Sequence, residues 1–152
     1  MADEVTLSVS IPTDLEGYIT IQCSLCSELF KVKHTDFEDE SQIQIWCPNC
    51  GLIPDSMITE EIRDLLLKTA NNYMSDLLND FNTELSKTFK KGGIEYKAGK
   101  KIKKASTDPL VSRIDILEIQ TYECCHQEAK ISPSLKMEGG YCPFCGEIQN
   151  GN

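Results

Sequence analysis

The feature that most constrains this chain of 152 residues is a cysteine knuckle that occurs twice. Residues 46–53 (WCPNCGLI) and 141–148 (YCPFCGEI) share one pattern: aromatic, Cys, Pro, any residue, Cys, Gly, any residue, Ile. Proline and glycine at these positions predict a tight turn whose backbone amides face two thiolates. Because structural zinc takes four ligands, each knuckle needs a second pair of ligands from elsewhere in the chain.

The first knuckle has its partner pair upstream, with twenty residues between Cys26 and Cys47. That spacing lies at the edge of the range for zinc sites built from two cysteine pairs. The N-terminal residues lack the positive start and apolar run of a secretion signal, so we expect a cytoplasmic protein, where disulfides are disfavoured. The expected ligands of a first Zn²⁺ are Cys23, Cys26, Cys47 and Cys50.

The second knuckle has a less regular partner, the run Cys124-Cys125-His126. Cys125 lies five residues before a Lys-Ile pair, as Cys26 lies five residues before a Lys-Val pair, so Cys125 corresponds to Cys26. The fourth ligand is then Cys124 or, in a rearranged turn, His126. We favour Cys124 because thiolates already dominate the site, which leaves His126 as a solvated turn residue. The expected ligands of a second Zn²⁺ are Cys124, Cys125, Cys142 and Cys145.

With these motifs, residues 18–53 and 119–148 resemble zinc ribbons, the class with rubredoxin-like knuckle pairs. The resemblance implies, for each segment, a three-stranded sheet with zinc between two hairpin tips. It implies no single function, because this scaffold serves nucleic-acid contact, protein docking and structural stabilisation alike. Rubredoxin itself holds redox iron with four thiolates. It normally has Gly after the second Cys of both knuckles, where this chain has Ser27 and His126.

Alternating apolar and polar residues predict short strands around both cysteine clusters. The expected strands lie within residues 5–11, 18–22, 30–32, 43–46 and 111–122. We interpret residues 34–41, which are acidic, as a turn.

The hydrophobic period changes to that of a helix after the first knuckle. Thr59 followed by two glutamates is a typical helix start, and Gly92-Gly93 a typical end. A helix over residues 59–91 would be about 48 Å long, whereas a ribbon strand of five residues spans only about 17–20 Å. The apolar face therefore needs another surface, from a second copy or a different protein. Its apolar positions are Ile62, Leu66, Ala70, Tyr73, Leu77, Phe81, Leu85 and Phe89. The opposite face is expected to stay in water and includes Asp76, Asn79, Asp80, Thr83 and Glu84.

Charge is distributed unevenly along the chain, whose net charge is −9. Residues 87–104 contain eight Lys and one Glu, a local charge of +7, while the remaining residues carry −16. One interpretation is that Lys97, Lys100, Lys101, Lys103 and Lys104 contact phosphates, with Tyr96 available for stacking on bases. The interpretation we favour is a solubilising linker, because the segment has no Arg and the overall charge opposes nucleic acid.

We therefore predict an α+β protein in which two small zinc-ribbon lobes are joined by a long amphipathic helix and a basic linker. The expected parts are an N-terminal ribbon with an extra strand (1–56), the helix (57–91), the linker (92–109) and a C-terminal ribbon (110–152). No apolar run is long enough to span a membrane.

The expected function is a zinc-binding adaptor or scaffold with two Zn²⁺ per chain, whose helix 59–91 binds a protein partner or forms a homo-oligomer. A nucleic-acid-binding accessory or transcription-related factor, with weak contact through Lys97–Lys104, is the alternative, and a rubredoxin-like electron carrier the third. An enzyme is not expected. The sequence has two histidines, no HExxH motif, and Cys₄ sites that leave no position for water.

Overall fold

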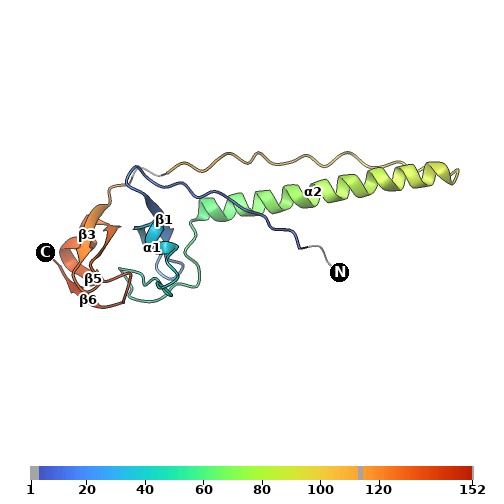
Figure 1. The fold of residues 1–152 in the computed structure, drawn as a ribbon. Helices are drawn as coiled ribbons and strands as arrows, with labels where there is room; N and C mark the ends of the chain where they lie inside the picture. Colours follow the sequence, from blue (N-terminus) through green and yellow to red (C-terminus); the bar gives the residue numbers. More distant parts are fainter. Residues whose placement is uncertain (1–3, 113–114, 152) are drawn as a thin grey trace. The chain divides into compact units, whose positions relative to one another are not determined.

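The structure is a computed structural model that describes residues 4–112 and 115–151 (Figure 1). The α+β architecture predicted from the sequence is confirmed, with one long helix between two antiparallel β regions that each carry four clustered cysteines. The elements are β1 (Tyr18–Gln22), β2 (Leu29–Lys33), α1 (His34–Phe37), α2 (Glu60–Lys91), β3 (Glu118–Tyr122), β4 (Gln127–Ile131), α3 (Pro133–Glu138), β5 (Gly139–Tyr141) and β6 (Ile148–Asn150). Among the described residues, no helix has the length and apolar character that crossing a bilayer requires.

Contacts between residues divide the chain into two units. One, the ribbon unit, comprises residues 11–60 and 110–151 and contains both cysteine clusters. The other, the helix unit, comprises residues 4–10 and 61–109 and contains nearly all of α2. The two units are described separately below.

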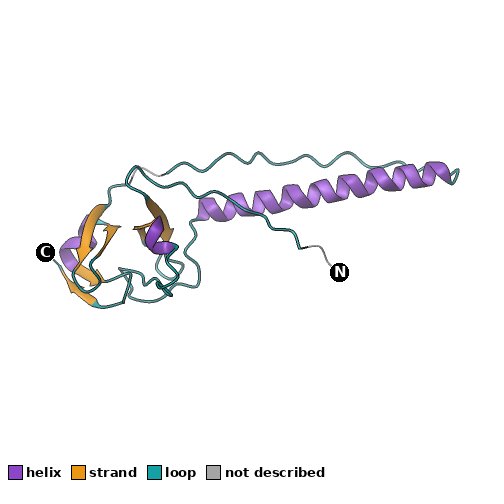
Figure 2. Cartoon of the chain, viewed as in Figure 1, coloured by secondary structure: helices purple, strands orange, loops and turns teal. Residues whose placement is uncertain are grey.

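The strands of the ribbon unit are drawn in orange in Figure 2. Four of them form one antiparallel sheet with the strand order β1-β2-β4-β3. Each cysteine-bearing half contributes one hairpin, β1–β2 or β3–β4. The central strands β2 and β4 pair directly, with Lys31 opposite Lys130 and Val32 opposite Ala129. We call this junction the seam. The two ribbons, which are far apart in sequence, therefore share a sheet.

The ribbon unit also has a single hydrophobic core to which both halves contribute. Phe30 and Val32 from β2, and Ala129 from β4, are fully buried. A lobe of about 40 residues rarely buries enough apolar surface to fold alone, and a shared core offsets that deficit. The buried members are Ile19, Ile21, Phe30, Val32, Ile45, Tyr122, Ala129, Ile131, Leu135, Cys142 and Phe144.

Several local expectations differ from the structure. Residues 5–11 and 43–46 form no strand, although both alternate as strands do. In the second segment Ile45 is buried in the core while Ile43 is 87% exposed, so the two alternating apolar residues do not share a buried face. The expected strand 111–122 is shorter, because β3 begins at Glu118, and Ile114 lies outside the described residues. The short helices α1 and α3 were not expected from the sequence, and α3 begins after Ser132, whose hydroxyl accepts a hydrogen bond from the Leu135 N–H.

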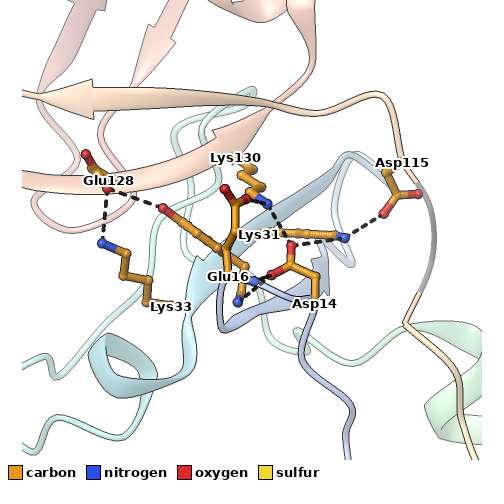
Figure 3. Close-up of polar contacts among 8 residues, drawn as sticks. Asp14, Glu16, Lys31, Lys33, Asp115, Glu128 and Lys130 are labelled. Atoms are coloured by element: carbon orange, nitrogen blue, oxygen red, sulfur yellow. Dashed lines mark hydrogen bonds and ion pairs between the residues drawn. The ribbon is translucent and has the colours of Figure 1, made fainter.

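A cluster of charged side chains covers the seam (Figure 3). Lys31 and Lys130 lie directly opposite each other on β2 and β4, an arrangement that is destabilising for like charges. Asp14 lies between them, with its Oδ2 2.8 Å from the Lys130 Nζ and 3.7 Å from the Lys31 Nζ. Glu16 also pairs with Lys130, and Asp115 lies 3.2 Å from the Lys31 Nζ. Carboxylates from outside the sheet thus neutralise the repulsion between the central strands.

A second ion pair crosses the seam two residues further along each strand, between Lys33 and Glu128. The Lys33 Nζ, on β2, lies 3.0 Å from the Glu128 carboxylate on β4 (Figure 3). The Tyr18 hydroxyl, on β1, donates a 3.4 Å hydrogen bond to the same carboxylate. Both contacts are partly exposed, so they add register specificity more than stability.

We predict that Asp14→Asn destabilises the metal-loaded protein by about 1–3 kcal/mol at pH 7, because two facing lysines lose their shared anion. The asparagine oxygen can still accept the backbone N–H groups of Glu16 and Tyr18, so the substitution isolates the charge. Burial alone would raise the pKa of Asp14, but Lys130 and the two N–H groups outweigh it and lower the pKa. Since the folded and unfolded pKa values then both lie below about 4, the difference should be constant from about pH 5 to pH 8.

Chemical denaturation of both proteins, with Glu40→Gln as an exposed control, measures this difference. Equal stabilities of Asp14→Asn and the control would show that the seam does not depend on the Asp14 charge.

Candidate metal centres

The first cysteine cluster joins the β1–β2 turn to the first knuckle. The Cys23 Sγ lies 3.9 Å from the Cys50 Sγ, and the Cys26 Sγ lies 3.5 Å from the Cys47 Sγ. All four sulfur atoms lie within 4.8 Å of one another. The structure therefore brings together the four residues that the sequence predicted as ligands of the first metal.

The second cluster joins the β3–β4 turn to the second knuckle. The Sγ atoms of Cys124 and Cys145 are 3.5 Å apart, and these two, with Cys125 and Cys142, again lie within 4.8 Å of one another. Of the two candidates for the fourth position, the group contains Cys124 and not His126. The adjacent cysteines of this turn thus reach the same arrangement that Cys23 and Cys26 reach with two residues between them.

These distances test whether a metal fits. Zinc–sulfur bonds of about 2.3 Å in a tetrahedron place the sulfur atoms about 3.8 Å apart. The three sulfur–sulfur separations given above, 3.5–3.9 Å, agree with that value, whereas a disulfide would require about 2.05 Å. A closed set of four thiolates suits a structural metal ion, and it leaves no open position for a bound water.

The two turns also share an unusual backbone conformation. Ser27 follows Cys26 with a φ of 64°, and His126 follows Cys125 with a φ of 54°. This left-handed region favours glycine, and non-glycine residues adopt it at a cost of about 1 kcal/mol. At Ser27 and His126 the chain therefore differs from the rubredoxin pattern only in its side chains, because the backbone takes the conformation that a glycine would take. It also supports the correspondence between Cys26 and Cys125.

The two knuckles repeat the same backbone hydrogen bonds. The N–H of Gly51 donates to the Cys47 carbonyl at 2.9 Å, and the N–H of Gly146 donates to the Cys142 carbonyl at 2.8 Å. Both glycines have a positive φ, of 70° and 76°. The repeated Gly of the sequence pattern is thus explained by the turn it occupies.

Side-chain amides add one further contact to each cluster. The Asn49 Nδ2 lies 3.7 Å from the Cys26 Sγ, and the Gln149 Nε2 lies 3.5 Å from the Cys124 Sγ. Such donors stabilise thiolate charge and orient the ligands of a metal. Neither residue stood out in the sequence, because one lies inside a knuckle and the other follows the second knuckle in β6.

The knuckles bind each other reciprocally, which the sequence analysis did not anticipate. The backbone N–H of Trp46 donates to the Pro143 carbonyl at 2.8 Å, and the backbone N–H of Tyr141 donates to the Pro48 carbonyl at 2.9 Å. Trp46 and Tyr141 are the aromatic residues that precede the first cysteine of each knuckle. We call this double contact the interlock.

Glycine makes the interlock possible on both sides. A Cβ atom at Gly51 would lie 2.8 Å from the Tyr141 ring, and one at Gly146 would lie 2.8 Å from the Trp46 indole. Each aromatic ring therefore covers the glycine of the other knuckle. The repeated aromatic and glycine of the sequence pattern were the available signal for this contact.

Protonation links metal binding to pH. Cys47 and Cys142 have no solvent exposure, and burial raises the pKa of both thiols. Burial also raises the pKa of Cys125, to about 11. Burial opposes the thiolates of Cys26 and Cys145 as well, but hydrogen bonds, first from the backbone N–H groups of Glu28 and Glu147, lower their pKa values. A metal must displace several protons, so its affinity falls as the pH falls.

Comparison of the chain with models of known protein families, with curated proteins and with solved structures finds no match. The class therefore follows from the site alone. Two tight Cys₄ clusters, each formed by a hairpin turn and a Cys-Pro-x-Cys-Gly knuckle, fit sites of the zinc-ribbon type.

We predict that protein purified without chelator contains two metal equivalents per chain. Cys124→Ser should lower the content to about one, whereas His126→Ala should retain two, because only the cysteine sulfur lies within the cluster. Elemental analysis of the three proteins measures this. Loss of the second equivalent in His126→Ala, with retention in Cys124→Ser, would assign the fourth ligand to the histidine.

We also predict that the two sites are coupled through the interlock. Disrupting the second knuckle with Cys142→Ser should weaken metal binding at the first site about fivefold, the equivalent of about 1 kcal/mol for one lost hydrogen bond. Competition with a chromophoric chelator measures the affinity, and the exposed Met137→Ala serves as the control. An unchanged first-site affinity in Cys142→Ser would show that the sites fill independently.

Proposed function

We propose that this protein is a zinc-binding adaptor or scaffold, in which Zn²⁺ stabilises the ribbon unit and α2 provides the surface that binds another protein. The closed Cys₄ geometry supports a stabilising metal, because four thiolates leave no vacant position for a substrate or water. Zinc is the ion most often held by such sites, and a colourless protein would agree with it. A red, iron-containing protein as purified would favour electron transfer instead.

The observation that carries the adaptor role is the exposed apolar face of α2. Leu67, Met74 and Phe81 follow one another at intervals of seven residues and are 56%, 53% and 58% exposed. Leu77 and Leu78 lie on the same side and are each 46% exposed. A contiguous row of large apolar side chains on a soluble surface is typical of a docking site. We call this row the apolar stripe.

The charges of α2 favour a second copy of the chain as the occupant. Residues 60–64 include three acidic residues and one Arg, whereas residues 87–91 include three Lys. Two such helices packed antiparallel would place the acidic start of each beside the basic end of the other. The seven-residue spacing is that of helices that pair through coiled-coil contacts. The self-complementary arrangement is that of a two-fold symmetric dimer.

We predict that Leu77→Ser combined with Phe81→Ser converts the protein from dimer to monomer at micromolar concentration. Each buried apolar side chain contributes about 1.5–3 kcal/mol, so removing four across the symmetric interface should weaken association by at least a hundredfold. Sedimentation equilibrium over a range of concentrations measures the dissociation constant, with metal content as the check on folding.

The matched control is Ile43→Ser combined with Ile116→Ser, which removes two apolar side chains that are each 87% exposed in the ribbon unit. It should associate like the unmodified protein. A wild-type chain that is monomeric at about 100 μM would exclude the second copy as the occupant, since that concentration exceeds the dissociation constant of a stable dimer.

A further inference from the structure

A pair of asparagines holds the segment that follows α2. The Asn72 Nδ2 donates to the Ala105 carbonyl at 2.9 Å, and the Asn72 Oδ1 accepts the Ala105 N–H at 2.8 Å. Asn79 makes the same two bonds with Ile102, at 3.2 Å and 3.0 Å. The segment 94–105, which we call the strap, therefore lies along α2 with its main chain bound in two places (Figure 1).

The spacing of these contacts matches two different periodicities. Asn72 and Asn79 are seven residues apart, a rise of about 10.5 Å along a helix. Ala105 and Ile102 are three residues apart, a rise of about 9.3 Å along a polyproline II chain, which repeats every three residues. A flat β-strand repeats every two residues and would not present both residues to one side. The two pairs of hydrogen bonds, which we call the ladder, therefore match a threefold extended conformation of the strap.

Other contacts secure the rest of the strap. The Tyr96 ring stacks on Phe89 with a centroid distance of 5.4 Å, and its hydroxyl donates to the Asn82 Oδ1 at 3.1 Å. The Lys104 Nζ lies 2.6 Å from the Asp76 carboxylate. Two expectations change as a result. Tyr96 already has a stacking partner and is not available for bases, and the polar face of α2 is partly covered by the chain's own strap.

The threefold repeat determines where the lysines lie. Tyr96, Ile102 and Ala105 are separated by multiples of three residues, so they share the position in the repeat that faces α2. From residue 97 onward, lysines occupy every position of the other two phases except Ala98, with Lys97, Lys100 and Lys103 in one row and Lys101 and Lys104 in the other. All five are exposed. The docked strap thus displays a linear array of positive charge with a repeat of about 9 Å.

We propose that the docked strap binds the phosphate backbone of nucleic acid without reading its sequence. An ordered row of lysines matches an extended polyanion, and ordering it in advance removes part of the entropy cost of binding. The strap has no Arg for bidentate contact with guanine, and its one aromatic ring is stacked internally, so it has no means of reading bases. This proposal is independent of association through the apolar stripe.

The experiment separates the charge of the strap from its docking. The probe is a labelled 20-nucleotide single-stranded DNA, titrated by fluorescence anisotropy from about 50 to 200 mM salt, where counterion release is measurable. Replacing Lys97, Lys100, Lys101 and Lys103 by Gln should reduce the slope of log affinity against log salt by about 0.7 for each lost phosphate contact.

Asn72→Ala combined with Asn79→Ala should act differently. It removes no charge, so the salt slope should stay the same, while the affinity falls about three- to tenfold at every salt concentration because the docked population falls. Asn71→Ala, at an exposed neighbouring position, is the matched control. Circular dichroism checks that α2 remains helical, which separates loss of docking from loss of the helix.

Three results with DNA alone would overturn the proposal, and one competition result would do so as well. These are absence of binding at about 50 mM salt, a lysine variant with an unchanged slope, and an asparagine variant that binds like Asn71→Ala. Polyglutamate that competes as well as DNA would also overturn it, in favour of an acidic protein surface. The ribbon unit of another copy is one such surface, since residues 11–60 and 110–152 carry 15 acidic and 5 basic residues. Running the titrations in the Leu77→Ser, Phe81→Ser background keeps the result distinct from dimerisation.

Discussion

The reciprocal contact between the two knuckles is the interaction on which the ribbon unit depends. The Pro143 carbonyl accepts a hydrogen bond from the backbone N–H of Trp46. The Pro48 carbonyl accepts one from the backbone N–H of Tyr141. A main-chain carbonyl on a tight turn is positioned only while that turn is intact. Two thiolates bound to a metal would hold the turn in shape, so a metal at either site would act beyond its own four ligands. Each filled cluster would thereby stabilise the surface that the other half binds.

In the shared sheet, as in the knuckles, each half of the ribbon unit stabilises the other. A hairpin of two five-residue strands is marginal alone, and pairing β2 with β4 turns two marginal hairpins into a four-stranded sheet. The pairing places Lys31 opposite Lys130, a repulsion that the strands themselves do not resolve. Asp14 resolves it from the turn that precedes β1. A single loop residue thus contacts both of the facing lysines at the junction of the two halves.

The sequence predicted the elements whose signals are local. Metal spacing identified both cysteine clusters, and the 3.6-residue period with its glycine end identified α2 almost to the residue. It did not predict the seam, because strand pairing between residues 31 and 130 leaves no local pattern. It did not predict the interlock either, although Trp46, Gly51, Tyr141 and Gly146 all belong to the repeated motif. The repeated glycine predicts a turn, but a motif does not reveal that its two copies touch.

The strap shows why composition was a poor guide to residues 94–105. Lysine and glycine are typical of a flexible linker, and the bonds that order this segment come from asparagines on another element and bind its main chain. Main-chain recognition leaves no trace in the sequence of the segment that is recognised. It also leaves the lysine side chains out of the docking hydrogen bonds, although Lys104 pairs with Asp76.

The position of the ladder bears on the rest of α2. Leu77 and Phe81 each lie two residues from Asn79, which places them about 200° around the helix, on the side away from the strap. Part of the polar face of α2 is thus used within the chain, and the apolar stripe is left exposed. A helix that were only internal scaffolding would bury its apolar face and expose its polar one. The exposure of the apolar stripe is therefore the physical reason to propose that a partner covers it.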